Sequence, residues 1–299
     1  GLLEDDFDLV MFCHPTGSAP SNWYAYAYIN HWASHYNHDS CEILLVQMHE
    51  VGHSLGLGHS GKGDEEYGDF SSMMGAGPAG DDHPVQCFNA NNNFQLGWYD
   101  LQKASINPLR YIYSPQTFVL NGIDDYKTDG SSNGELITLR LRNFGGKGGT
   151  DYYIGYNRAT GPNQGTREAR DTVVIYSKET SLFQYGNSKR AFDMQDGDRY
   201  TIYSYRNTIY DVYIDVESIS DDLRDATIVI STSVSSDGCN DDPEFDFKGL
   251  DKNCTHWVGK GKNEKKIKRR CRRMHEGIRV WNHCPKTCAM VGLGKCNSS

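Results

Sequence analysis

One short stretch constrains this chain more than any other, because residues 49–59 read H-E-x-x-H-x-x-G-x-x-H. On a helix, positions i and i+4 lie on one face, so His49 and His53 can point at a single ion. Gly56 can take a left-handed conformation, end the helix and turn the chain back, which brings His59 toward the same point. The motif therefore predicts a helix, a tight turn and a three-histidine metal site.

The residue types also indicate the chemistry of this site. Three neutral imidazoles leave a fourth tetrahedral position open for water, which is the catalytic arrangement for Zn²⁺ and not the structural one. Glu50 is not needed as a ligand and is free to act as general base on that water. We predict zinc ligands at His49, His53 and His59, with Glu50 as the catalytic base. A bare H-E-x-x-H also occurs on solvated helix faces, but the eleven-residue form is much harder to obtain by chance.

A second element of the same pattern follows in the chain. The eleven-residue motif resembles the signature of metzincin zinc proteases, which also have a methionine turn beneath the metal. Residues 71–75 read Ser-Ser-Met-Met-Gly. Two methionines filling a gap in a core are the alternative, but the two elements in this order favour a Met-turn.

The length of 299 residues fits two or three domains. No run of about eighteen or more apolar residues is present, so we expect no membrane span. The sequence starts Gly-Leu-Leu without a signal segment, so we expect a mature or truncated piece, with a signal peptide and any pro-segment upstream.

The nine cysteines are unevenly distributed. Six of them crowd into the last part of the chain: Cys239, Cys254, Cys271, Cys284, Cys288 and Cys296. So dense a set indicates a disulfide framework and an extracellular compartment. The early cysteines, Cys13, Cys41 and Cys87, are odd in number, so one is free or pairs outside this sequence.

The formal net charge of −9 hides an asymmetry. From residue 237 onward the chain has fourteen Lys/Arg against eight Asp/Glu, a net +6, which leaves −15 for the sixteen Lys/Arg and thirty-one Asp/Glu before it. A basic tail on an acidic body predicts that the tail meets an anionic surface, and a solubilising loop is the equal alternative. The most basic stretch, Lys260–Arg273, is expected to form a projecting, solvated loop.

Around the motif, Asp8–Cys13 is predicted to be a buried strand. Trp23–Ile29 alternates aromatic and small residues, as in an edge strand that lines a substrate cleft or, equally, in a half-buried structural strand. Cys87–Tyr99 is predicted to be a short helix that ends at Gly97. Three further histidines lack the motif's glutamate and are treated as ordinary polar residues: His31, His35 and His38.

The pattern changes after residue 100 to short β-type runs separated by Gly, Asn, Asp and Ser turns. The runs are Thr117–Leu120, Leu136–Leu141, Tyr152–Tyr156, Thr172–Tyr176, Tyr200–Tyr205, Tyr210–Val216 and Ala226–Ile230. This spacing predicts an antiparallel, β-sandwich-like domain. Its tyrosines are candidates to bind glycan or peptide, but packing is the simpler reading.

Several segments resemble the gametolysin/autolysin family of secreted algal zinc metalloproteases, which digest the glycoprotein cell wall. These segments are Trp23–Ile29, Met48–His53, Tyr67–Asp69, Met73–Gly75, Cys87–Ala90 and Gln95–Tyr99. The resemblance implies the same ligands and base as above, and Met74 as the Met-turn methionine, with Met73 second. This sequence differs from the family pattern at Ala76, where the family has a tyrosine that can approach the metal. Tyr67 is a candidate to substitute for it.

The cysteines from Cys239 to Cys296 resemble the ShKT module, a small three-disulfide domain that is also appended to secreted proteases. The resemblance implies the pairs Cys239–Cys296, Cys254–Cys284 and Cys271–Cys288. Sequence alone leaves fifteen pairings of six cysteines open.

We therefore predict an N-terminally truncated α+β metzincin-like domain (residues 1–100), a β-rich accessory domain (101–236) and a ShKT-like module (237–299). The function predicted is a secreted zinc endopeptidase that acts on cell-wall or matrix glycoproteins, with hydroxyproline-rich wall protein as a candidate substrate. We expect a monomer and no nucleic-acid partner. The alternative is a non-catalytic adhesion or wall-binding protein that uses the β-rich domain and the tail.

Overall fold

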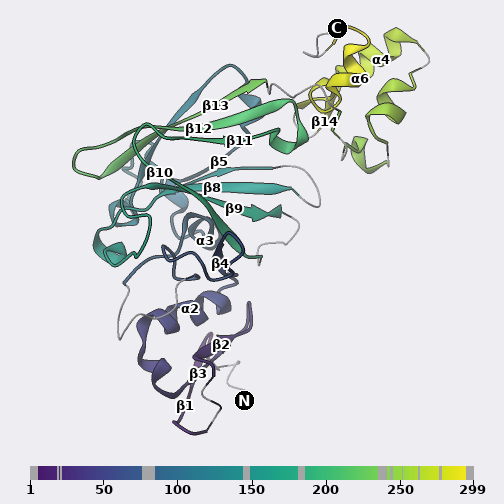
Figure 1. Cartoon of the computed structure of the whole chain (residues 1–299). Helices are drawn as coiled ribbons and strands as arrows, with labels where there is room; N and C mark the ends of the chain where they lie inside the picture. Colours follow the sequence, from purple (N-terminus) through teal and green to yellow (C-terminus); the bar gives the residue numbers. More distant parts are fainter. Residues whose placement is uncertain are drawn as a thin grey trace.

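The computed structural model describes residues 6–18, 20, 22–75, 85–143, 149–180, 186–234, 241–242, 245–250, 252–261, 263–275 and 278–293. It is a mixed α/β structure with several sheets (Figure 1). A small sheet with one helix lies at the N-terminal end, two larger sheets form the middle, and a helical module lies at the C-terminal end. Within these ranges, no helix has the length and apolar character needed to cross a membrane.

The N-terminal sheet contains β1 (Val10–His14), β3 (Ala33–Asn37) and β2 (Ala25–Ala27), in that order. β1 and β3 are parallel, and β2 is the antiparallel edge strand. The two predicted strands are present, but the prediction that the first is buried is wrong, because β1 alternates half-buried and exposed residues. β3 was not predicted, because its sequence ASHYN has no regular apolar alternation. A disulfide, Cys13–Cys41, joins β1 to the turn before the next helix, and among the described cysteines Cys87 is free.

The motif helix, α2 (Leu44–Ser54), begins in an apolar run that buries Leu45 and Val46. Leu55 caps its end, and Gly56 has φ = +88°, the left-handed conformation that the motif predicts. A small core lies under the helix, and its buried members are Leu45, Leu57, Met73, Met74 and Phe88.

The central part has a six-stranded and a four-stranded sheet that share one hydrophobic core. The six-stranded sheet runs β4 (Ser60–Lys62), β10 (Ser188–Met194), β9 (Val173–Glu179), β8 (Thr150–Tyr156), β7 (Thr138–Leu141) and β5 (Lys103–Ile106). The four-stranded sheet runs β11 (Arg199–Ile202), β12 (Tyr210–Ile219), β13 (Asp225–Val234) and β6 (Gln116–Asn121). All seven predicted β-type runs overlap observed strands.

Two details of the β prediction are wrong. The six-stranded sheet is mixed, because β4 pairs with β10 and β5 pairs with β7 in parallel. Residues 60–62, for which the sequence predicts no strand, form the edge strand β4. Their sequence, Ser-Gly-Lys, has no apolar residue to indicate a strand, so the pairing with β10 imposes this conformation.

The predicted helix within Cys87–Tyr99 is α3 (Ala90–Leu96), capped by the Asn89 side chain and ended by Gly97 at φ = +72°. It packs on the six-stranded sheet, where the Phe94 and Tyr153 rings lie 5.5 Å apart. Leu96 of the same helix packs on the small core under α2, so α3 contacts both the N-terminal part and the six-stranded sheet.

The C-terminal module is a set of short helices with a small hairpin. Its elements are a turn at Cys254–Gly259, α4 (Glu264–Cys271), β14 (Met274–His275), β15 (Ile278–Arg279), α5 (Val280–His283) and α6 (Pro285–Ala289). The implied pairs Cys254–Cys284 and Cys271–Cys288 are present, and Cys239–Cys296 lies outside the described residues. The prediction of a solvated loop at Lys260–Arg273 is wrong, because most of it forms α4.

Candidate metal centre

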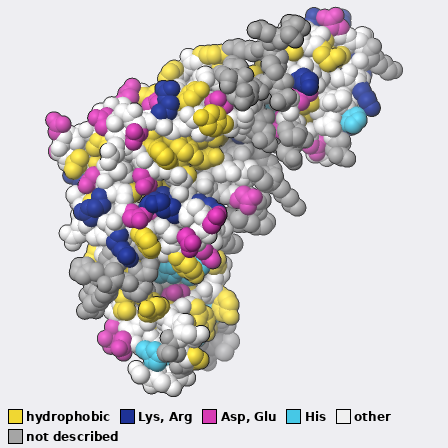
Figure 2. All heavy atoms as spheres, viewed as in Figure 1, with side chains coloured by type: hydrophobic (Ala, Val, Ile, Leu, Met, Phe, Trp, Pro, Cys, Tyr) yellow, Lys and Arg dark blue, Asp and Glu magenta, His cyan; other side chains and the backbone are white. Residues whose placement is uncertain are grey.

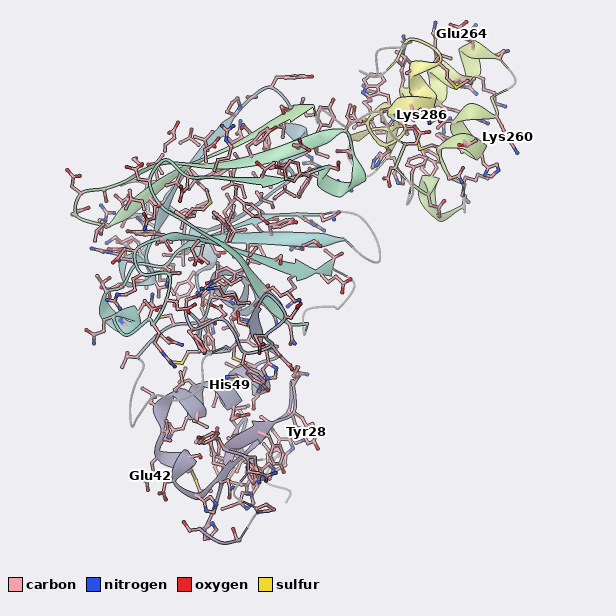
Figure 3. The ribbon with its side chains drawn as sticks, in the orientation of Figure 1. Tyr28, Glu42, His49, Lys260, Glu264 and Lys286 are labelled. Carbon is pink, nitrogen blue, oxygen red and sulfur yellow. A yellow bond between two sulfur atoms is a disulfide. The ribbon has the colours of Figure 1, made fainter. Side chains whose placement is uncertain are left out.

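The predicted histidines converge at the boundary between the N-terminal part and the sheets (Figure 3). His49 and His53 project from one face of α2, and His59 follows the turn at Gly56. One nitrogen from each ring lies within 4.8 Å of the others, and Nε2 of His53 lies 3.1 Å from Nε2 of His59. Histidine side chains are visible on the surface at this boundary in Figure 2.

The far side of each α2 imidazole is held by a backbone carbonyl. His49 Nδ1 lies 2.9 Å from the Met73 oxygen, and His53 Nδ1 lies 2.8 Å from the Leu57 oxygen. A carbonyl only accepts hydrogen bonds, so each Nδ1 must carry the proton and each Nε2 must present its lone pair. These are the tautomers that bind a metal through Nε2.

His59 is held by side chains from two distant parts of the chain. Its Nδ1 lies 2.6 Å from Glu66 Oε1, and its backbone N–H donates to Asn187 Oδ1 at 2.9 Å. Asn187 also donates to the same Glu66 oxygen at 3.3 Å. The Ser188 N–H donates to the His59 carbonyl at 2.9 Å. This hydrogen bond lies at the start of the pairing between β4 and β10. No sequence pattern marks Asn187, because it lies 128 residues after His59.

The methionine turn lies directly beneath α2. Met74 is fully buried, and its Sδ lies only 2.5 Å from where a Cβ would lie at Gly52. Any larger residue at this motif position would therefore collide with Met74. A Cβ at Gly75 would lie 2.2 Å from the Asp69 carbonyl oxygen, so the turn is closely packed on both sides. Ala76 lies outside the described residues.

Asp69 connects this turn to the six-stranded sheet. Its carboxylate accepts hydrogen bonds from Ser60 Oγ at 2.6 Å and from the Ser71 N–H at 3.1 Å. It also pairs with Arg190 of β10 at 3.2 Å, and both side chains are buried. The segment beneath the histidines is thus fixed to the central part by a buried ion pair.

The electrostatics of the site favour neutral imidazoles. Burial, with the neighbouring His53, lowers the pKa of His49 to about 3, although its hydrogen bond to Met73 opposes the shift. Burial also lowers the pKa of His53. Both rings are therefore unprotonated at neutral pH, the form that a metal needs.

Glu50 has the properties of a proton carrier. It is 6 % exposed, and its Oε2 has no hydrogen-bond partner among the described residues. Burial raises the pKa of Glu50 to about 7, against a hydrogen bond from the Ala27 backbone that lowers it. A carboxyl with a pKa near neutrality can both accept and release a proton.

One aromatic residue covers the histidines from the solvent side. The Tyr67 ring lies 4.2 Å from the His59 ring and 6.1 Å from the His49 ring, between centroids, and the residue is half exposed. Burial raises the pKa of Tyr67, so it keeps its hydroxyl proton. His31, His35 and His38 lie outside the cluster. Among the described residues, only the triad forms a group of three or more His, Cys, Asp or Glu that could hold a metal.

Comparisons with known proteins place part of this chain beside one peptidase family. The family model described as gametolysin peptidase M11 matches residues 10–116. An autolysin from Chlamydomonas reinhardtii is 44 % identical over 59 residues, which are 18 % of this chain and 8 % of the relative. The chain thus spans a small part of that relative's length. No solved structure matches the chain.

Proposed function

We propose that the chain is a zinc-dependent endopeptidase, on the premise that residues 10–116 match the gametolysin family of M11 peptidases. The observation that carries the proposal is the triad His49, His53 and His59, whose ring nitrogens lie within 4.8 Å of one another. Their Nδ1 atoms face oxygen acceptors, so the donor set fits a zinc ion bound through Nε2.

In this proposal each residue of the site has a separate role in catalysis. Zinc, when bound, polarises the scissile carbonyl and makes water a nucleophile at neutral pH. Glu50 takes the proton from the attacking water and delivers it to the nitrogen of the leaving amine. Tyr67, whose ring lies beside the His59 ring, is assigned to donate its hydroxyl hydrogen to the oxygen that gains negative charge. The free edge of β2, beside α2, can align an extended peptide by adding it as a strand.

The domains, the compartment and the substrate class are assigned as part of the same proposal. We assign residues 1–100 to a metzincin-like domain, the two central sheets to a β-sandwich-like accessory domain, and the C-terminal part to a ShKT-like module. Met74 is the Met-turn methionine. The disulfides support a secreted protein. The candidate substrates are cell-wall or matrix glycoproteins, including hydroxyproline-rich wall protein.

The test compares the wild-type chain with Glu50→Gln. Cleavage of a denatured protein and of hydroxyproline-rich wall glycoprotein is measured with and without a chelator, while bound zinc is quantified. We expect one zinc per chain in both proteins, chelator-sensitive cleavage by the wild type, and a loss of several orders of magnitude in the variant, about 10³-fold or more. An active Glu50→Gln variant, or a wild type that binds no zinc, would contradict the proposal.

The alternative function is non-catalytic adhesion through the β-rich part and the C-terminal module. The intact triad and base argue against it. A wild-type chain that binds zinc and wall material but cleaves neither substrate would favour adhesion.

A further inference from the structure

The C-terminal module concentrates positive charge on one helix. Seven of the nine residues 265–273 are Lys or Arg. Figure 2 shows Lys and Arg side chains on the outer surface of this module. Figure 3 places Glu264, the first residue of α4, at the end of the module away from the sheets. The helix therefore turns a charged run into an outward surface of defined geometry.

Helix periodicity places the basic residues of α4 on a different side from its apolar residues. Positions i, i+3, i+4 and i+7 lie on one side of a helix. In α4 and its capping residue Arg272, these positions are Lys265, Lys268, Arg269 and Arg272, which we call the basic face. The opposite side carries Ile267, which packs on the module core, and the buried Cys271, which is bonded to Cys288. Seven residues of rise give the basic face a length of about 10 Å.

The module's own carboxylates leave most of this charge uncompensated. Among the described residues, only Glu264 pairs with the basic face, through Lys268. The other described carboxylates of the module are engaged elsewhere: Asp241 accepts from Thr287, Asp242 pairs with His283, and Asp246 accepts from the Lys252 N–H. The Arg279 guanidinium donates to the Arg272 carbonyl and adds a fifth cation at this end.

Folding alone does not explain this arrangement. Like charges at i, i+3 and i, i+4 destabilise a helix, and the basic face contains such pairs along its whole length. A helix of eight residues is also marginal by itself. The disulfide at Cys271 and the burial of Ile267 hold α4 in place despite the repulsion. A local conflict of this kind indicates a binding surface.

We propose that the basic face binds an acidic polysaccharide, a polymer of sugars that carry sulfate or carboxylate groups. Lys and Arg form charge-assisted hydrogen bonds with such groups. The disulfides indicate an extracellular compartment, whereas anionic lipid is concentrated on the cytoplasmic leaflet. The acidic remainder of the chain, with its net charge of −15, repels a polyanion, so attraction is confined to this module.

The test measures binding of the full chain to immobilised heparin and polygalacturonate, as sulfated and carboxylated probes, over a salt series. One variant removes the basic face: K265Q, K268Q, R269Q and R272Q. A matched control removes four exposed lysines elsewhere in the module: K248Q, K252Q, K260Q and K286Q. Thiol titration and circular dichroism verify that both variants keep their disulfides and fold.

We expect the basic-face variant to bind at least one probe roughly ten- to a hundredfold more weakly than the wild type, and the control to change far less. Binding should also weaken steeply with salt. Equal losses in both variants would mean that net charge alone attracts the polymer, which overturns the proposal. A wild type that binds neither probe overturns it as well. So does a wild type that binds only vesicles of phosphatidylcholine and phosphatidylserine, which would assign the face to lipid.

Discussion

At the scale of single residues, the metal centre depends on atoms that do not touch the metal position. Each histidine has its Nδ1 fixed by an oxygen, so the ring orientation exists before any ion arrives. Such preorganisation lowers the entropy cost of binding. Glu50 lies in the same buried environment and differs from the ligands by having one oxygen without a described partner. The roles of ligand and base are thus separated by hydrogen bonding.

Tyr67→Phe tests the residue that covers the triad. We expect zinc binding to stay unchanged, KM to change little, and kcat to fall about ten- to a hundredfold, because a hydroxyl donor to the developing charge is lost. Steady-state kinetics with metal quantification gives all three quantities. Tyr203→Phe, at an exposed tyrosine outside the triad, is the control and should keep full activity. An unchanged kcat for Tyr67→Phe would remove the hydroxyl from the mechanism.

Lys178 makes stability depend on pH. It is buried on β9 and donates to Gln95 Oε1 at 2.8 Å, and burial lowers its pKa from 10.5 to about 8. Between these values the unfolded chain holds the proton and the folded chain does not, so stability rises with pH.

The measurement is urea unfolding of wild type and Lys178→Met at neutral pH and near pH 10. The free energy of unfolding of the wild type minus that of the variant should increase by about 2–3 kcal/mol from neutral pH to near pH 10. Lys189→Met, at an exposed lysine of β10, corrects for the loss of a positive charge. Parallel pH profiles for wild type and Lys178→Met would show that the lysine is not desolvated in solution.

At the scale of elements, the sequence predicts what side-chain periodicity encodes. It predicted α2 and the left-handed Gly56, because the motif requires both. It missed β4, whose three residues Ser60–Lys62 take strand conformation only through pairing with β10. It also missed β10, whose sequence SKRAFDM mixes charges with apolar residues and contains a bulge. In α4, the buried Cys271 and the partly buried Ile267 among many charges are too weak a pattern to predict a helix.

Asn187→Ala tests the link between β10 and the metal centre. The variant removes the acceptor of the His59 N–H and a donor to Glu66. We expect zinc affinity to fall about ten- to a hundredfold, as for other groups that orient a ligand from behind. Competition with a chromophoric chelator measures this directly. Gln195→Ala, an exposed amide just after the same strand, should bind zinc like the wild type; equal affinities for all three proteins would confine the site to the N-terminal part.

At the scale of the whole molecule, the parts are less separate than the sequence suggests. Segment boundaries near residues 100 and 236 follow changes in composition. The contacts that cross the first boundary, such as Asp69 with Arg190, join residues 121 apart and leave no local pattern in the sequence. The convergence of His49, His53 and His59 could be predicted because they lie within one short motif. The residues that hold them from the sheet could not be predicted, because they lie far away in the sequence.

A truncation tests this integration. A chain of residues 1–100 lacks β10 and exposes the side of α3 that packs on the sheet, including Phe94. A chain of residues 1–236 keeps both the strand and this packing. We expect the shorter chain to bind zinc at least about tenfold more weakly and to bind a dye for exposed apolar surface. Zinc titration and dye fluorescence compare the two. If residues 1–100 alone bind zinc as tightly as residues 1–236, the sheet would be dispensable for the centre.

The pairing of β4 with β10 also has a consequence for the time at which activity can arise. A polypeptide emerges from the ribosome with its N-terminus first. All three histidines leave the ribosome well before Ser188, whose N–H holds the His59 carbonyl, has been synthesised. Closing so long a loop is slow and comes late in folding. During that interval a growing chain carries the complete motif without the strand that holds His59, so the site of a protease of this design is completed only after β10 has been synthesised.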